Sequence, residues 1–405
     1  MVGGGAAGLM AAITAKREAR EHVHISIYEQ NREPAKKILD SGNGRCNISN
    51  TSPSGDDYFG RHPHFVTPAL THLDYPAFER FARTIGLTLD IKSDGRVYPL
   101  SNEARSVKEA MVREARRLGV AIHTDARVES IEKKETGFSL HVLNEPILFD
   151  RVLLATGSPA APQLGGNFDG MRLARSLGHT IVEPYPALVG LHLAGSSHTR
   201  MSGIKVQARL RLYVDGRVHL DTKGDLLFTR YGISGFAVLD LSTEASRWLA
   251  KGKKVTVGIH LLPDYDRQGI FALLQKMSKA APWLTLGETL QGVLPHKIVT
   301  QLLMDLDFAP TVSVASVEGK SWRKIAATLS DWRFDVTDTH GYKHAEVAGG
   351  GVDTAEVSAK TMASKKVEGL FFAGEVLDIV GKRGGFNLHF AWASGQLAGR
   401  HLIRR

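Results

Sequence analysis

Cysteine is nearly absent from this 405-residue chain, which carries only Cys46. A single cysteine excludes an internal disulfide framework and any C-x-x-C redox pair, and it is typical of a reducing cytosol. No apolar stretch approaches the ~20 residues that a membrane-spanning helix needs. The first residues also lack the basic-then-apolar order of a secretory signal. We therefore expect a cytoplasmic protein of two or three domains that does not enter a membrane.

Motifs of several enzyme classes are missing too. No second G-x-G-x-x-G opens another βαβ unit, so a dedicated nicotinamide domain is not expected. The pairs His22/His24 and His62/His64 lack a third ligand of suitable spacing, so no metal site is predicted. The segment 232–235 lacks the G-x-S-x-G spacing of a hydrolase nucleophile. These absences disfavour disulfide reductases, metalloenzymes and serine hydrolases.

The most informative segment is Gly3–Gly8, which fits G-x-G-x-x-G and precedes an Ala-rich helical pattern. In a dinucleotide site the first glycine allows the turn, the second lets the pyrophosphate approach, and the third lets helix and strand pack closely. The N–H groups at the helix N-terminus then bind the pyrophosphate. Glu29 ends the next apolar segment, about 20 residues on, where a ribose 2′-hydroxyl is bound. The pattern predicts a dinucleotide site.

The segment before this motif is short. Only Met1 and Val2 precede Gly3, whereas an ordinary strand has about 5–6 residues. We expect either a trimmed chain or a true start upstream, with loss of a central strand from the core and weaker cofactor binding.

Positive charge is concentrated in one part of the chain. The formal net charge is +9, and residues 200–254 hold 11 Lys and Arg against 5 Asp and Glu. A basic surface attracts anionic partners such as RNA. The alternative is a solvated sheet face, because no RNA-binding signature with interleaved aromatic residues accompanies the charge.

Hydrophobic periodicity predicts a doubly wound α/β domain built from both chain ends, with a β-rich insertion that carries a helical piece. Helices are expected at 6–19, 76–85, 102–118 and 387–402, and over 268–304 with breaks at Pro282 and Pro295. Strands are expected at 22–28, 127–131, 138–143, 147–155, 206–214, 217–220, 254–262, 328–336 and 371–375, and a loop at 36–50. The expected domains are 1–188 with 342–405, 189–264 with 313–341, and 265–312.

Near the C-terminus, residues 374–388 have the same order of elements as the N-terminus: the end of a strand, a glycine-rich turn and the start of a helix. Glu375 or Asp378 could bind ribityl hydroxyls. The N–H groups of 385–388 could face the negative charge that develops at the N1/C2-oxygen edge of a reduced flavin. The alternative is a glycine loop and helix start without a ligand.

Four parts of the chain carry a family resemblance: Gly3–Gly8, 37–50, 226–235, and 372–378 with 384–388. In these parts, and over nearly its whole length, the chain resembles the aminoacetone-oxidase/BaiN-like FAD-dependent flavoproteins. The resemblance implies a Rossmann-type FAD-binding domain made from both chain ends, with an inserted β-barrel-like domain and a helical subdomain. Residues 42–47 and 385–388 would then line the isoalloxazine. The cofactor-binding residues that it implies are Gly3, Gly5, Ala6, Ala7, Gly8, Glu29, Lys37, Gly42, Gly44, Arg45, Cys46, Asn47, Val128, Ala155, Thr156, Gly157, Gly374, Glu375, Asp378, Gly385, Phe386, Asn387 and Leu388.

The chain departs from the family pattern at several positions. A usual His is Arg230, a usual Pro is Phe236, and a usual loop Gly is Asn43. Because an arginine stays protonated, an acid/base role does not carry over to position 230. Tyr231 and His389 are the candidates for proton transfer, with a structural role as the alternative for each.

Cys46 is either a thiolate near the flavin or a small buried hydrophobe. Arg45, Asn47 and the 385–388 amides are the residues that we expect to tune the flavin.

Activities in the family include small-amine oxidation, reduction of conjugated enones and reduction of a uridine in ribosomal RNA. The resemblance therefore predicts an FAD-dependent oxidoreductase that performs hydride transfer on a small or conjugated substrate, with NAD(P)H as a transient electron donor. One alternative is a flavin-dependent reductase of uridine in ribosomal RNA, which the basic segment motivates. Another is a flavin-binding redox sensor without turnover. The substrate, the electron donor or acceptor (NAD(P)H or oxygen), the catalytic acid/base and the oligomeric state stay open, because fold does not settle function.

Overall fold

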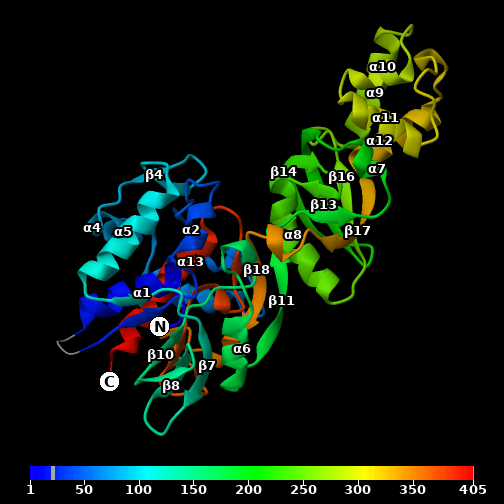
Figure 1. Ribbon diagram of the computed structural model, residues 1–405. Helices are drawn as coiled ribbons and strands as arrows, with labels where there is room; N and C mark the ends of the chain where they lie inside the picture. Colours follow the sequence, from blue (N-terminus) through cyan, green and yellow to red (C-terminus); the bar gives the residue numbers. More distant parts are fainter. Residues whose placement is uncertain (20–22, 405) are drawn as a thin grey trace. The chain divides into compact units, whose positions relative to one another are not determined.

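The computed structural model describes residues 1–19 and 23–404, and these form two compact units. The first unit combines Met1–Tyr185 with Glu346–Arg405, so both chain ends contribute to it. The second consists of Pro186–Ala345. Figure 1 shows the elements of each unit. The domain boundaries expected from the sequence stay a prediction.

A short parallel sheet lies at the centre of the first unit. Strand β1 (Ser26–Tyr28) pairs in parallel with β6 (Ala121–His123), and β10 (Val152–Leu154) pairs in parallel with β19 (Leu370–Phe372). Val2 joins the two pairs, because it forms parallel bridges to both β1 and β10. Its N–H donates to the carbonyl of Leu153 at 2.8 Å. Met1 and Val2 therefore fill the central position of the sheet, as a first strand does in this architecture.

Two helices from opposite chain ends lie side by side in this unit. They are α1 (Ala6–Glu18), blue in Figure 1, and α13 (Phe386–Leu402), red. A Cβ added at Gly395 would lie 2.4 Å from the carbonyl oxygen of Ala7, and one at Gly399 would lie 2.3 Å from that of Ala11. Only glycine allows the helices to approach this closely. The small residues of α1 and α13 therefore fix one chain end against the other.

The remaining elements of the first unit complete its layers. An antiparallel meander is made of β7 (Val128–Lys133), β8 (Phe138–Val142) and β9 (Glu145–Phe149). The other helices are α2 (Lys36–Asp40), α3 (Thr67–His72), α4 (Tyr75–Thr84), α5 (Ala104–Arg117) and α6 (Asp169–Ser176). The other strands are β2 (Ser49–Asn50), β3 (Tyr58–Phe59), β4 (Leu89–Ile91), β5 (Arg96–Pro99), β11 (Ile181–Ala187), β18 (Val347–Val352) and β20 (Val380–Gly381).

A closed six-stranded barrel forms the second unit, in the order β12-β15-β14-β13-β16-β17. Along β13 the even positions Ala208, Leu210 and Leu212 are buried, whereas Arg209 is exposed, which is the alternation of a strand with one apolar face. The barrel strands are β12 (Leu191–Leu193), β13 (Lys205–Val214), β14 (Arg217–Phe228), β15 (Gly232–Ser234), β16 (Val255–His260) and β17 (Trp332–Thr339).

Helices complete this unit. Helix α8 (Phe236–Ala250) lies on the barrel, and α9 (Arg267–Ala280), α10 (Leu286–Gln291) and α11 (His296–Asp305) gather at one end of the unit (Figure 1). Helix α12 (Gly319–Ser330) packs against α9 and against β16. The short α7 (Ser197–Arg200) follows β12. The predicted fold class, a Rossmann-type domain with an inserted β-barrel and a helical part, is confirmed.

Three predicted elements were wrong in detail. The strand expected at 147–155 is two strands, β9 and β10, which separate at Asp150 and belong to different sheets. The start of the strand expected at 328–336 is the last turn of α12, whose buried Trp322, Ile325 and Leu329 have helical spacing. The loop expected at 36–50 contains α2 and β2. Of the strand expected at 22–28, residue 22 lies outside the described residues.

Candidate cofactor site

The glycines of the first motif divide into two kinds. A Cβ added at Gly8 would lie 2.1 Å from the carbonyl oxygen of Gly3, and one at Gly3, where φ is +99°, would lie 2.4 Å from that of Ala155. A Cβ at Gly5 would meet no protein atom within 4 Å. Gly3 and Gly8 are therefore required by packing, whereas Gly5 leaves open space at the N-terminus of α1. Open space beside unpaired first-turn N–H groups is what a bound phosphate requires.

Glu29 is held in a fixed position at the end of β1. The side chain is buried, and its Oε2 accepts a hydrogen bond from the Gly4 amide at 2.8 Å. Its Oε1 accepts from the backbone N–H of Asn31 at 2.9 Å and from the Asn31 side-chain amide at 2.7 Å. The carboxylate is thereby oriented beside the glycine motif, and Asn31 is a residue that the sequence prediction missed. Its position two residues after Glu29, from which its backbone and side-chain N–H groups both reach the carboxylate, is the signal that could have found it.

Three separate segments meet around Glu375. The Nζ atom of Lys37, on α2, lies 2.7 Å from Glu375 Oε2, and the Ser158 hydroxyl donates to the same oxygen at 3.1 Å. Ser158 follows β10 and was not predicted, although it comes directly after the predicted Ala155–Gly157. The Thr156 hydroxyl is buried without a hydrogen-bond partner among the described residues. This hydroxyl faces the backbone of Gly170, where an added Cβ would lie 1.8 Å from it, so protein atoms already cover the hydroxyl.

The loop after α2 has an unusual backbone. Gly42, Asn43, Gly44 and Cys46 all have positive φ, between 56° and 79°. Asn43 stands where the resembling family has glycine, and its φ of 56° explains the exchange, because asparagine tolerates the left-handed region. Arg45 extends along this loop, with its guanidinium 5.4 Å from the centre of the Tyr98 ring. A run of left-handed residues is typical of a functional site.

The same loop contacts the start of α13. With its amide oriented so that both groups are satisfied, Asn47 accepts from the Gly385 N–H at 3.1 Å and donates to the carbonyls of Val97 and Ser49. The Asn50 amide donates to the Gly384 carbonyl at 3.1 Å. The structure therefore brings the predicted segments 42–47 and 385–388 together, although more than 300 residues separate them in the chain.

The turn before α13 is fixed on both sides. A Cβ added at Gly385, where φ is +95°, would lie 2.1 Å from the Ser49 carbonyl oxygen. Asn387 accepts from the Gly381 N–H at 2.7 Å and donates to the Gly381 carbonyl at 2.9 Å. The Tyr58 hydroxyl donates to the Phe386 carbonyl at 3.0 Å. These contacts hold the first N–H groups of α13, including that of Leu388, in one orientation.

His389 and Cys46 are both fully buried. Burial lowers the pKa of His389 to about 4, so its ring is neutral at pH 7. Its Nε2–H donates to the Leu73 carbonyl at 2.9 Å, which leaves Nδ1 to accept from the Ser49 hydroxyl at 2.7 Å. Burial raises the pKa of the Cys46 thiol to about 12, so the thiol stays protonated and behaves as a small hydrophobe. Both side chains therefore serve packing and positioning.

Three predicted residues lie apart from these contacts. Asp378 is buried, and its Oδ2 accepts from the Arg61 N–H at 2.9 Å; burial raises the pKa of this carboxyl. Val128 is a buried residue at the start of β7. Tyr231 belongs to the second unit. The roles assigned to these residues, and to the cofactor-binding set as a whole, stay predictions.

The residues of the first unit fit a dinucleotide. They combine open space at Gly5, an oriented carboxylate at Glu29 and the N–H groups at the start of α13. No group of three His, Cys, Asp or Glu side chains among the described residues could hold a metal ion.

A family model described as HI0933-like protein Rossmann domain matches residues 1–401. The chain belongs to this family. It is therefore an FAD-dependent oxidoreductase, with FAD as its cofactor, and the predicted family, cofactor and enzyme class are confirmed.

Two curated relatives match the whole chain. It is 33% identical over 405 residues to the 3-dehydro-bile acid delta(4,6)-reductase of Clostridium scindens, with 100% of this chain and 98% of the relative covered. It is 32% identical over 406 residues to the ribosomal RNA dihydrouridine synthase of Escherichia coli, with 100% and 97% covered. Both names are those of enzymes, so the redox-sensor alternative has no support.

The fold is also similar to that of a solved enzyme structure. The quinol fumarate reductase of Escherichia coli matches with a TM-score of 0.50 at 16% identity, covering 99% of this chain and 69% of that one. At this identity the likeness concerns the fold alone. Among the described residues, no helix has both the length and the apolar character needed to cross a bilayer.

Proposed function

We propose that this protein reduces a carbon–carbon double bond conjugated to a carbonyl in a small cyclic substrate, with NAD(P)H as electron donor. The names of the two relatives support this choice, because they share one chemistry. A 3-keto compound with double bonds at positions 4 and 6 is a conjugated enone, and uracil carries its 5,6 double bond next to the 4-carbonyl. In both, saturation requires a hydride at one carbon and a proton at its neighbour.

The observation that carries the proposal is the contact between the two chain ends, where Asn47 accepts from the Gly385 N–H. FAD, when bound, supplies the hydride transfer. The residues of the chain would hold and orient it: the open face at Gly5 would admit the pyrophosphate, and Glu29 would bind the ribose. The first amides of α13, fixed by Asn387, would stabilise negative charge that develops on the bound ring.

The proton must come from outside these residues. His389 is buried with both ring nitrogens occupied, and Cys46 is buried as a thiol. Neither side chain has access to a substrate. We infer that a group beside the substrate, or water, delivers the proton.

Anaerobic stopped-flow absorbance tests the proposal. The FAD-loaded protein is first reduced with NADH or NADPH and then mixed with a 4,6-dien-3-one steroid, with uridine, or with a saturated ketone as the control. We expect bleaching by the nicotinamide and rapid return of the oxidised spectrum with a conjugated substrate, but not with the saturated ketone. Equal rates with conjugated and saturated compounds would contradict the proposal.

Reduction of uridine in ribosomal RNA is the second candidate, favoured by the basic segment. Arg209 and Arg211 both lie beside Asp221, at 3.2 and 3.5 Å, and Lys223 pairs with Asp264 at 2.8 Å. Asp221 is already counted in the excess of positive charge over residues 200–254, so of these pairs only that with Asp264, outside the segment, reduces the excess.

Salt dependence separates the two candidates. If RNA is the substrate, kcat/KM should fall steeply with salt and after charge reversal at Arg209, Arg211 or Lys223. We expect only a weak salt dependence for a small neutral substrate.

A further inference from the structure

Four ring side chains cluster in the second unit. Three of them, Tyr231, His340 and His344, form a stack that we call the ring column. The ring centroids of Tyr231 and His340 lie 3.7 Å apart, with an angle of 10° between the ring planes. Those of His340 and His344 lie 4.0 Å apart, with an angle of 24° between the planes. His192 lies against the side of the column, with its Nε2 2.9 Å from Nδ1 of His340. Rings stacked this closely and this nearly parallel are in direct face-to-face contact.

The barrel topology builds the column from distant parts of the chain. Strand β12 lies between β15 and β17, and His192 on β12 pairs with Gly232 of β15 and with Asp338 of β17. Tyr231 directly precedes Gly232, and His340 follows the end of β17. The rings therefore meet because the start of β15 and the end of β17 both lie beside His192 on β12.

Two glycines make the close stacking sterically possible. A Cβ added at Gly190 would lie 2.5 Å from the Tyr231 hydroxyl oxygen, so the ring passes directly over this backbone position. The Gly190 carbonyl also accepts from the His340 N–H at 2.8 Å. Gly341, at φ +77°, turns the chain so that the helical turn Tyr342–His344 brings His344 back onto His340.

The central ring of the column, that of His340, is uncharged at neutral pH. Burial lowers the pKa of His340, and the neighbouring His344 and His192 lower it further. The hydrogen bond between His192 and His340 needs at least one nitrogen without a proton. No metal-binding group of three side chains exists in the described part of the chain. These properties suit a neutral ligand better than an anion or a metal ion.

Exposure differs along the column. Tyr231 and His340 are half-buried, whereas His344 is exposed. The column therefore begins at the half-buried ring of Tyr231 and ends at the exposed ring of His344. A stack that ends in an exposed ring can be extended by one further flat ring. Stacking of this kind requires a ligand with a flat π-face and accepts different rings that have one.

We propose that the ring column is a binding platform for a planar, conjugated ring that carries a carbonyl, with His344 as the residue in contact with it. The proposal rests on the proposed function, because it assigns a recognition site to the same class of substrate. Uracil and a conjugated steroid ring are the two sources of this chemistry. The site itself consists only of residues of the second unit.

Planarity provides a direct test. Uridine is planar at its base, whereas 5,6-dihydrouridine has nearly the same groups on a puckered ring; a 4,6-dien-3-one steroid and its saturated ketone make a second pair. Binding of each compound to the oxidised FAD-loaded protein is measured by calorimetry, without an electron donor. We expect one planar member, from either pair, to bind at least about tenfold tighter than its saturated partner.

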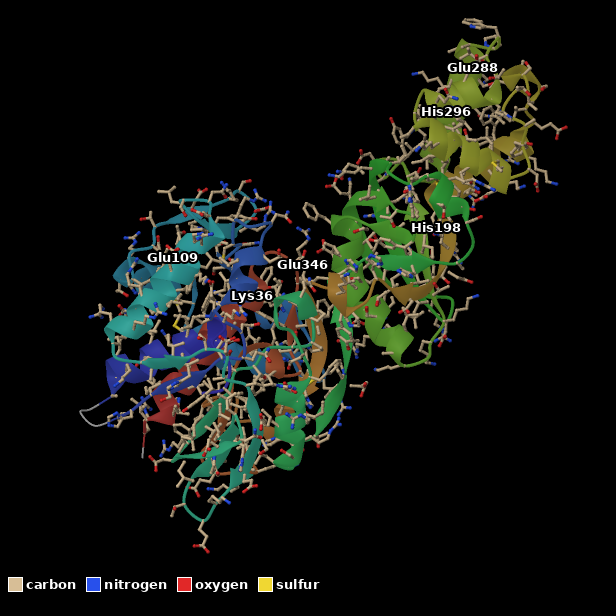
Figure 2. All side chains as sticks on the ribbon, viewed as in Figure 1. Lys36, Glu109, His198, Glu288, His296 and Glu346 are labelled. Atoms are coloured by element: carbon tan, nitrogen blue, oxygen red, sulfur yellow. The ribbon has the colours of Figure 1, made fainter. Side chains whose placement is uncertain are left out.

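Variants at position 344 locate the binding site. His344→Ala should weaken binding of the planar compound roughly tenfold and leave the saturated one unchanged, whereas His344→Phe should restore binding because it keeps a flat ring. His296→Ala is the matched control, since His296 is an exposed histidine on α11 of the same unit (Figure 2). Because His344 is exposed, its replacement should leave folding intact.

The outcomes are separable. Equal binding of planar and saturated compounds, no binding of either, or unchanged binding by His344→Ala would overturn the proposal. Failure of the protein to oxidise when mixed with conjugated substrates would instead contradict the proposed function, since the binding experiment involves no turnover.

Discussion

The Gly5→Ala substitution separates cofactor binding from folding. The added methyl group meets no protein atom within 4 Å, so it introduces no clash in the free protein. Alanine is less favourable than glycine at a helix N-cap. It also lowers the conformational entropy of the unfolded chain, which stabilises the folded protein by about 0.4–1 kcal/mol. These effects oppose each other, and we expect the unfolding free energy of the protein without FAD to change by less than about 1 kcal/mol.

FAD affinity should change much more. The methyl group occupies the space through which a pyrophosphate approaches the first N–H groups of α1. Loss of one hydrogen bond to a charged group is worth about 1.5–3 kcal/mol, which corresponds to roughly ten- to hundredfold weaker binding. The measurement is a titration of FAD fluorescence in the apoprotein, paired with urea unfolding of the same sample.

Two matched variants sharpen this test. Gly8→Ala places a Cβ 2.1 Å from the Gly3 carbonyl oxygen, so it should lose stability as well as FAD affinity, by about 1–3 kcal/mol in stability. Gly319→Ala lies at the start of α12 with no atom within 4 Å and should change neither FAD affinity nor stability adversely. If Gly5→Ala binds FAD as tightly as the unmodified protein, the pyrophosphate does not lie at this turn and the reasoning is refuted.

Two further predictions concern pH. The pKa of His389 is lowered from 6.5 to about 4 in the folded protein, so the unfolded chain takes up a proton at this residue more readily than the folded protein does. The contribution of the neutral His389 to the unfolding free energy is therefore complete above pH 6.5 and is lost as pH falls toward 4. The loss between pH 7 and 5 is about 2 kcal/mol, and His389→Gln should reduce it in urea unfolding. Arg117 and Arg17 hold the pKa of Glu114 at about 2, so its contribution is present above pH 4.5 and lost as pH falls through 2. Glu114→Gln should lower the unfolding free energy at pH 7 by about 2 kcal/mol, and an unchanged midpoint would contradict this.

The parts of the site that depend on local backbone were predictable from the sequence. Gly3–Gly8 and 384–388 are motifs whose function follows from glycine conformation and from the exposed N–H groups at a helix start. The positive φ of Gly385 and the close approach of Gly8 to Gly3 are the physical reasons why these residues are glycines. A short motif therefore specifies this geometry without knowledge of the rest of the fold.

The rest could not be predicted in the same way. The ring column depends on the register of β12 against both β15 and β17, and no local pattern reveals which strand ends meet in a barrel. The sequence therefore shows Tyr231 as a single candidate, without its neighbours in the column. The apolar segment 328–336 was ambiguous because the end of α12 runs directly into β17. Short apolar runs fit helix and strand equally well.

The central claim is that both ends of the chain bind one FAD. Its most direct test is the stoichiometry and affinity of FAD binding by the apoprotein, measured for the unmodified chain, for Glu29→Gln and for Gly385→Ala. We predict one FAD per chain, with binding weakened at least about tenfold by each substitution, because each removes a feature contributed by a different chain end. Full-strength FAD binding by the Gly385→Ala protein, or no FAD binding by the unmodified protein, would contradict the account.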